Sequence, residues 1–218
     1  MKISGAIFDM DGTLLNSMDY WGTVGSEFLI KNGFDSKSDD NRRFLERGMR
    51  EFYKYATEEL GLTKSYQEVH DEIYNLIREK YETVVAPKNG AIKMLDTLLE
   101  KGVKMCLATA TDRETVELIL KRLDMKKYFS KIFTSGEVGV GKSEPKIYEL
   151  ALEHLGTPKE KTYVFEDAYY AINTASKAGF NVIGIYDKNV FVPVEEIKPL
   201  CVHFIEEGDQ YNIDFLLK

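Results

Sequence analysis

Short apolar runs alternate with helical patterns along most of the chain. Apolar runs typical of buried strands occupy residues 2–8, 103–108, 131–133, 162–165 and 181–185, with 202–205 as a candidate for one more. Helices are expected between them, over residues 92–101, 115–123, 147–155 and 168–178. Repeated strand–helix–strand units predict a parallel sheet with helices on both faces, and continuous apolar strands fit burial on both sides.

One long segment interrupts this alternation after the first strand. Residues 16–88 carry helical apolar patterns and no convincing strand. A turn-rich stretch, Ala86-Pro87-Lys88-Asn89-Gly90, marks the return to the alternating pattern. We therefore expect an α/β core domain with a Rossmann-like sheet, formed by residues 1–15 and 89–218, and an inserted α-helical domain at residues 16–88.

Composition narrows the class of protein. The chain has 218 residues, a net charge of −7, 44% hydrophobic and 30% charged residues, the balance of a globular protein. This acidic charge argues against a nucleic-acid-binding surface, and no apolar run approaches the ~20 residues that span a bilayer. No signal-peptide core precedes Asp9, so a cytoplasmic enzyme is expected, with no membrane partner.

Carboxylates follow the first and fourth predicted strands. Asp9 and Asp11 stand two residues apart after the first strand, so they point the same way if the backbone stays extended. Like charges at this spacing suit a hard cation such as Mg²⁺, although helix or turn capping is an alternative. The fourth strand ends in Glu166 and Asp167, and capping of the next helix explains at most one of them.

The second and third strands are followed by residues that suit a phosphate. Thr109 and Ala110 end the second strand with a hydroxyl and exposed amides, whereas Thr111 or Asp112 is a candidate helix cap. Lys142 follows the third strand, either as a counter-charge for phosphate or as an ordinary solvated lysine. Because ligand sites of open parallel sheets lie beyond the carboxyl ends of the strands, all four sets should meet at one edge. Acids, a lysine and a hydroxyl together predict phosphoryl transfer.

A second pattern competes for the same lysine. Residues 136–143 match the P-loop spacing of two glycines followed by Lys142 and Ser143. This alternative predicts an ATPase. It places Pro145 almost at once in the helix that should hold the phosphates, and it leaves Asp9 and Asp11 without a role.

The four strand ends, in this order, resemble the haloacid dehalogenase (HAD) superfamily. Asp9-Met10-Asp11-Gly12-Thr13 is similar to its first motif, Thr109 to the second, Lys142 to the third and Glu166-Asp167 to the fourth. The resemblance covers the whole chain and is to the β-phosphoglucomutase-like phosphatases, which carry a helical cap. It implies the same α/β core, with residues 16–88 as the cap.

The resemblance also implies a role for each motif residue. Asp9 would attack phosphorus to form an aspartyl-phosphate, and Asp11 would act as general acid and then as general base. Mg²⁺ would be held by the Asp9 carboxylate, the Asp11 backbone carbonyl and Asp167, with Glu166 nearby. The phosphoryl oxygens would be bound by Thr109 and Ala110, and Lys142 would hold Asp9 and the transferring charge together.

The chain departs from the family pattern in three places, one of them Asn16, which stands where an aspartate is common. Near the third motif, Ser143 and Lys146 replace a proline and an aspartate, and that aspartate normally helps to anchor the lysine; Glu144 is a candidate substitute. In the first cap helix, Trp21 stands where the mutases have a histidine. The changes at Trp21 and Asn16 favour a phosphatase over a mutase.

Candidate substrate residues lie in the predicted cap. Arg47 and Arg50 are placed to clamp an anionic or hydroxyl group of a substrate, or to form a solvated helical face. Trp21 is a candidate for packing on a sugar, or for the core of the cap.

The expected function is that of a Mg²⁺-dependent phosphatase acting on a small phosphorylated metabolite, a sugar phosphate by preference. The alternatives are a β-phosphoglucomutase-type mutase, a non-catalytic phosphoryl-binding module and the P-loop ATPase. The expected assembly is a monomer or a homodimer.

Overall fold

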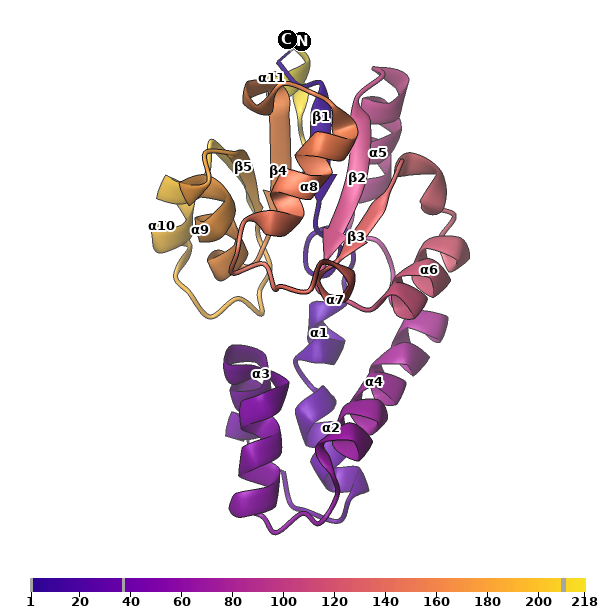
Figure 1. Ribbon diagram of the computed structural model, residues 1–218, viewed down its shortest axis with the longest axis vertical. Helices are drawn as coiled ribbons and strands as arrows, with labels where there is room; N and C mark the ends of the chain where they lie inside the picture. The colour runs from indigo at the N-terminus through magenta and orange to yellow at the C-terminus, as the bar shows by residue number, and fades with distance from the viewer. Residues whose placement is uncertain (1, 37, 209–210) are drawn as a thin grey trace. The chain divides into compact units, whose positions relative to one another are not determined.

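The computed structural model describes residues 2–36, 38–208 and 211–218, without the side chains of residues 38–43 and 45–48. The chain divides into two compact units (Figure 1). One comprises Met1–Asn16 and Ala86–Lys218, and the other comprises Ser17–Val85.

The larger unit is built on a six-stranded sheet in which every strand pair is parallel. The strand order is β3-β2-β1-β4-β5-β6. The strands are β1 (Gly5–Phe8), β2 (Lys104–Thr109), β3 (Ile132–Thr134), β4 (Thr162–Glu166), β5 (Asn181–Ile185) and β6 (His203–Ile205). The Rossmann-like α/β fold predicted from the alternating pattern is therefore confirmed.

Helices follow nearly every strand of this unit. They are α5 (Ala91–Glu100), α6 (Arg113–Arg122), α7 (Ser135–Val138), α8 (Lys146–Leu155), α9 (Tyr169–Lys177), α10 (Val194–Ile197) and α11 (Asp214–Leu217). On one face of the sheet, Ile7 and Val164 pack with Ile147 of α8 and Ile172 of α9 in a buried core. β1 and β4 are buried on both faces, as the continuous apolar runs predict.

The smaller unit consists of helices. They are α1 (Met18–Trp21), α2 (Val24–Lys31), α3 (Ser38–Glu58) and α4 (Tyr66–Thr83), and none of the described residues between them forms a strand. Phe28 and Phe52 meet edge to face in its core, with Ile73 and Ile77 of α4 also buried. Ser65 and Glu68 form a capping box that sets the start of α4.

The chain leaves and re-enters the α/β unit at one place. The Asn16 amide donates to the Ala86 carbonyl at 2.9 Å, and the Lys88 amide donates to the Leu14 carbonyl at 2.8 Å. Leu15 and Pro87 form an antiparallel bridge between the two segments. The helical unit is therefore an insertion whose two ends are joined side by side.

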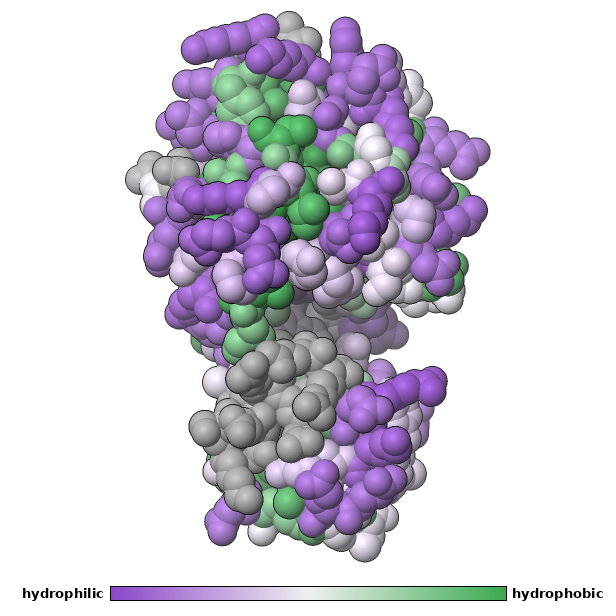
Figure 2. All heavy atoms as spheres, turned by 90° about the vertical axis from the view of Figure 1, so that its left-hand side faces the viewer, coloured by the Kyte–Doolittle hydropathy of each residue, from purple (hydrophilic) through white to green (hydrophobic). Residues whose placement is uncertain are grey.

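The surface of the α/β unit is mainly hydrophilic on the side of α9 and α10, around a smaller apolar area (Figure 2). Among the described residues, no helix combines the length and the apolarity needed to cross a membrane.

Candidate active site

The end of β1 carries the first two acids. Asp9 follows four buried strand residues and is itself only 5% exposed. The chain then turns sharply, because the Leu14 and Leu15 amides both donate to the Met10 carbonyl. Gly12 has a φ of 81° in this turn, a conformation that glycine adopts without strain. The glycine after Asp11 is therefore required by the turn that carries the two carboxylates.

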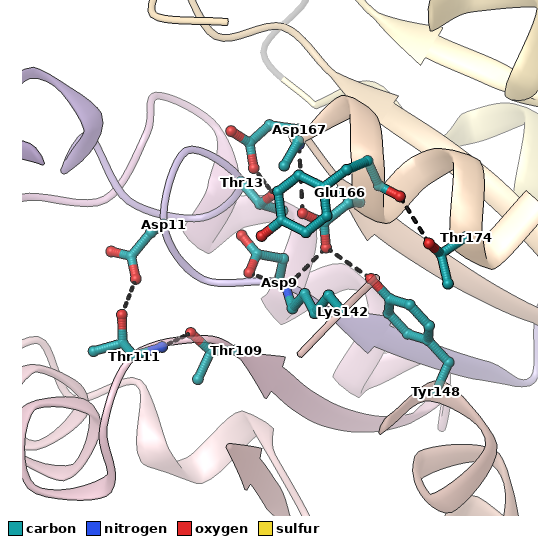
Figure 3. Close-up of polar contacts among 12 residues, drawn as sticks. Asp9, Asp11, Thr13, Thr109, Thr111, Lys142, Tyr148, Glu166, Asp167 and Thr174 are labelled. Atoms are coloured by element: carbon teal, nitrogen blue, oxygen red, sulfur yellow. Dashed lines mark hydrogen bonds and ion pairs between the residues drawn. The ribbon is translucent and has the colours of Figure 1, made fainter. Parts of the chain in front are cut away.

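Lys142 joins two of the predicted acids in the interior. Its Nζ forms a short contact with Asp9 Oδ1 and donates to Glu166 Oε2 at 2.9 Å (Figure 3). All three side chains are buried, and they come from the end of β1, the loop before α8 and the end of β4. Lys142 is thus a buried counter-ion and not a solvated loop lysine.

The protonation states follow from this pairing. Burial alone lowers the pKa of Lys142, but the charges of Asp9 and Glu166 outweigh it and hold the pKa well above its usual value. Burial, reinforced by the charge of Asp9, raises the pKa of Glu166 to about 7. The Lys142 ammonium group is therefore charged at neutral pH, whereas burial and the charge of Asp9 disfavour the ionised form of Glu166.

Asp167 completes a buried acidic group. Carboxylate oxygens of Asp9, Glu166 and Asp167 all lie within 4.8 Å of one another. The Thr13 hydroxyl donates to Asp167 Oδ1 at 3.1 Å and orients it. Burial first, and then the charges of Asp9 and Glu166, raise the pKa of Asp167 well above its usual value. Asp167 also lines a cavity of about 240 Å³ that continues past the end of β5.

These residues fit a divalent cation. Lys142 is paired with Asp9 and Glu166, and the nearby Lys88 is paired with Asp187, so ionised acids leave the buried group of Asp9, Glu166 and Asp167 with an excess of negative charge. Asp9 Oδ2 is buried and has no hydrogen-bond partner among the described residues. Hard carboxylate oxygens that lack a proton donor are suitable ligands for Mg²⁺.

The end of β2 brings the predicted phosphate residues to the same edge. Thr109 is buried, and its hydroxyl accepts from the Thr111 amide at 3.1 Å, while Ala110 is exposed. Asp112 is the cap of α6, since its carboxylate accepts from the Thr115 amide at 2.9 Å. Sequence reasoning could not choose between Thr111 and Asp112 as the cap, and the structure assigns it to Asp112.

Three contacts of the site could not be read from the sequence pattern. Tyr148 lies on α8 among apolar residues, and its hydroxyl donates to Glu166 Oε2 at 3.3 Å. Glu166 in turn anchors Lys142, whereas the side chain of the candidate anchor Glu144 is exposed. Thr13 was part of the first motif, but its hydrogen bond to Asp167 depends on the pairing of β1 with β4.

The P-loop alternative is also wrong. Residues after β3 form the short helix α7, where a P-loop would follow its strand with a phosphate-binding loop. The next helix, α8, begins only at Lys146, and Lys142 is committed to Asp9 and Glu166.

The candidate substrate residues belong to the helical unit. Trp21 is partly buried, stacks on Phe44, meets Tyr74 edge to face and donates to the Tyr81 hydroxyl at 2.9 Å. Arg50 is exposed on α3. The side chain of Arg47 lies outside the described residues.

Comparison with known proteins identifies the family. The sequence-family model of the haloacid dehalogenase-like hydrolases matches residues 6–185. A phosphorylated carbohydrates phosphatase from Thermotoga maritima is 30% identical over 83% of this chain and 84% of that protein. Pyrophosphatase PpaX from Bacillus mycoides is 27% identical over 85% of this chain and 84% of that protein.

Structural comparison agrees with the sequence comparison. The crystal structure of a putative β-phosphoglucomutase from Thermotoga maritima superposes with a TM-score of 0.84 and 24% identity, over 99% of this chain and 100% of that chain. This similarity supports the assignment of the fold. The chain therefore belongs to the haloacid dehalogenase-like hydrolases, and it is a phosphatase of that family.

Proposed function

We propose that the protein is a Mg²⁺-dependent phosphatase of small sugar phosphates and that Asp9 is its nucleophile. The observation that carries the proposal is the buried acidic group around Lys142, in which Asp9 Oδ2 has no hydrogen-bond partner among the described residues. A carboxylate held at one oxygen by a cation, at the ligand-binding edge of a parallel sheet, is suited to attack a phosphate ester.

In the first step, a carboxylate oxygen of Asp9 attacks phosphorus. A P–O bond to Asp9 forms, the ester P–O bond breaks, and Asp11 gives its proton to the leaving alcohol oxygen. The Lys142 ammonium group keeps Asp9 oriented and offsets the negative charge that gathers at phosphorus. The product is an aspartyl-phosphate and a free alcohol.

In the second step, water attacks the phosphorus of the aspartyl-phosphate. Asp11, now ionised, takes the proton of the water, and the P–O bond to Asp9 breaks. Inorganic phosphate leaves and both aspartates return to their starting states. Thr109 and Ala110 bind the phosphoryl oxygens during both steps, through the hydroxyl and the amides at the end of β2.

Asp9, Asp167 and the Asp11 backbone carbonyl would hold Mg²⁺, with Glu166 nearby. Bound there, the ion would neutralise negative charge on the phosphoryl oxygens. The protein prepares the ligands beforehand, since the Thr13 hydroxyl orients Asp167 and Lys142 orients Asp9.

The substrate class rests on the relatives. The protein with 30% identity is named for phosphorylated carbohydrates, whereas the one with 27% identity is named a pyrophosphatase. A sugar phosphate is therefore the first choice and pyrophosphate the second. We assign substrate selection to the helical unit, where Trp21, Arg47 and Arg50 remain predictions.

The test is phosphate release from a panel of sugar phosphates, polyol phosphates, nucleotides, pyrophosphate and 4-nitrophenyl phosphate. Each compound is assayed with Mg²⁺ and with a chelator, and Asp9→Asn is assayed in parallel. We expect release from one or two sugar phosphates, lost without the metal and lost in the variant.

Other outcomes assign other functions. Turnover confined to pyrophosphate would replace the sugar phosphate. If no compound of the panel releases phosphate, the phosphatase proposal is wrong. Isomerisation of a sugar phosphate that needs an added bisphosphate would then identify a mutase. Without turnover in that assay either, the protein would be a phosphoryl-binding module.

A further inference from the structure

A hydroxyl from the neighbouring strand end holds the Asp11 carboxylate. Thr111 Oγ1 donates to Asp11 Oδ2 at 2.6 Å (Figure 3). Thr111 is 5% exposed, so water competes little for this hydrogen bond. The two residues are 100 positions apart in the chain and are brought together because β1 and β2 are adjacent strands.

The direction of the Thr111 hydroxyl is set by hydrogen bonds that hold the backbone on either side of it. The Thr111 amide donates to Thr109 Oγ1 at 3.1 Å, which ties the residue to the end of β2. On its other side, Asp112 caps α6 and holds the start of that helix in place. Threonine is stiff about χ1, so a fixed backbone fixes the hydroxyl. The hydroxyl takes no part in capping α6 and is committed to Asp11 instead.

We infer that Thr111 is a positioning residue, which aligns the Asp11 carboxylate for proton transfer to the leaving group. This inference rests on the proposed function, in which Asp11 is the acid and base. In this proposal Thr111 contacts Asp11 and does not contact the phosphoryl group. Proton transfer requires hydrogen-bond geometry between acid and leaving oxygen, and small misplacements of a catalytic group are costly. A carboxylate held at Oδ2 loses rotational freedom before the substrate arrives.

The experiment compares two esters of similar shape. The phenol released from phenyl phosphate is about as weakly acidic as a tyrosine side chain, so its departure needs a proton. The 4-nitrophenolate released from 4-nitrophenyl phosphate leaves without one. The value of kcat/KM reports the step in which the ester bond breaks, and it is measured for both esters with Mg²⁺ in the wild type, Thr111→Val, Thr111→Ser and Asp11→Asn.

We expect Thr111→Val to lose about 10- to 100-fold in kcat/KM on phenyl phosphate and less than about threefold on 4-nitrophenyl phosphate. Thr111→Ser, which keeps the hydroxyl, should restore most of the loss. Asp11→Asn should show the same preference for the nitrophenyl ester more strongly. A purely structural role of Thr111 would lower both rates together. If the valine variant is unfolded at the assay temperature, Thr111→Ala takes its place in the same comparison.

Two results separate the failure of this inference from that of the proposed function. Equal losses on both esters in Thr111→Val, beside a clear ester preference in Asp11→Asn, would overturn the role of Thr111 alone. No ester preference in Asp11→Asn, or no turnover of either ester by the wild type, would overturn the acid role of Asp11 and this inference with it.

Discussion

Asp167 is a residue at which stability and function oppose each other. It is 3% exposed and stands beside the charges of Asp9 and Glu166, and burial and these charges raise its pKa well above the usual value. An acid whose pKa is raised on folding lowers the free energy of unfolding as pH rises from its unfolded pKa to its folded pKa, because the unfolded chain releases the proton first. The residue is nevertheless suited to a metal, because a cation removes that cost.

Asp167→Asn should therefore stabilise the metal-free protein. At pH 7 we expect the free energy of unfolding to rise by about 0.5–2 kcal/mol, since the amide keeps an acceptor for Thr13 and cannot ionise in the unfolded chain. The gain should shrink as pH falls through the raised pKa and vanish below about pH 4, where the unfolded wild type is protonated too.

The same variant should lose the increase in Tm that Mg²⁺ gives the wild type. Thermal unfolding with and without Mg²⁺ measures both effects, and Asp35→Asn, at an exposed carboxylate, is the matched control. A less stable metal-free Asp167→Asn, or an undiminished response to Mg²⁺, would contradict the account of this site.

At the scale of elements, β5 lies so close to β6 and to the segment before it that the size of the side chain at Gly184 is restricted. A side-chain carbon on Gly184 would lie 2.5 Å from Cδ2 of the Phe204 ring and 2.8 Å from the Cys201 sulfur. Phe204 is directly paired with Gly184 in the sheet, so its ring and the Cys201 sulfur would both have to shift to admit the added carbon.

Gly184→Ala should consequently cost about 1–3 kcal/mol of stability through overpacking. Gly136→Ala is the control, because Gly136 lies in helix α7 with no atom within 4 Å of the added carbon and should gain slightly from helix propensity. Chemical denaturation of both variants measures the difference; equal stability would show that β6 adapts freely.

Element boundaries also show where local patterns stop being sufficient. The apolar run at residues 2–8 predicted a strand, but β1 begins only at Gly5. The Lys2 amide donates to the Leu216 carbonyl and the Ser4 amide to the Lys161 carbonyl, so the first residues are bonded outside the named strands. Apolar residues indicate that a segment is buried. Whether the segment is a strand depends on whether its backbone is hydrogen-bonded to a neighbouring strand.

At the scale of the whole molecule, the joined ends of the insertion make the α/β unit separable. Residues 14–16 and 86–88 run antiparallel and are hydrogen-bonded to each other. We expect that replacing residues 17–85 with the dipeptide Asn-Gly, which favours a tight hairpin turn, leaves a folded α/β unit.

This shortened protein should unfold cooperatively and bind Mg²⁺, because every residue of the acidic group lies outside the deleted segment. It should retain slow hydrolysis of 4-nitrophenyl phosphate and lose the selectivity among sugar phosphates assigned to the helical unit. Thermal unfolding with Mg²⁺ and the substrate panel provide the measurement, and retained selectivity would move substrate recognition into the α/β unit.

The sequence by itself determined the parallel sheet, the helical insertion and the four strand ends at which the candidate site residues lie. These follow from local information, since hydrophobic period and strand length set the element types and the parallel order puts their carboxyl ends at one edge. For the same reason Asp9, Asp167 and Lys142 could be selected before any distance was known.

Only the tertiary structure decided which of these side chains hold one another. The contacts of Glu166 with Lys142 and of Thr111 with Asp11 join residues 24 and 100 positions apart, and the contact of Tyr148 with Glu166 spans 18. No periodicity reaches over such separations, because the partner of a buried polar group depends on strand order and loop path. The sequence therefore identified the chemical groups, and folding determined their pairing.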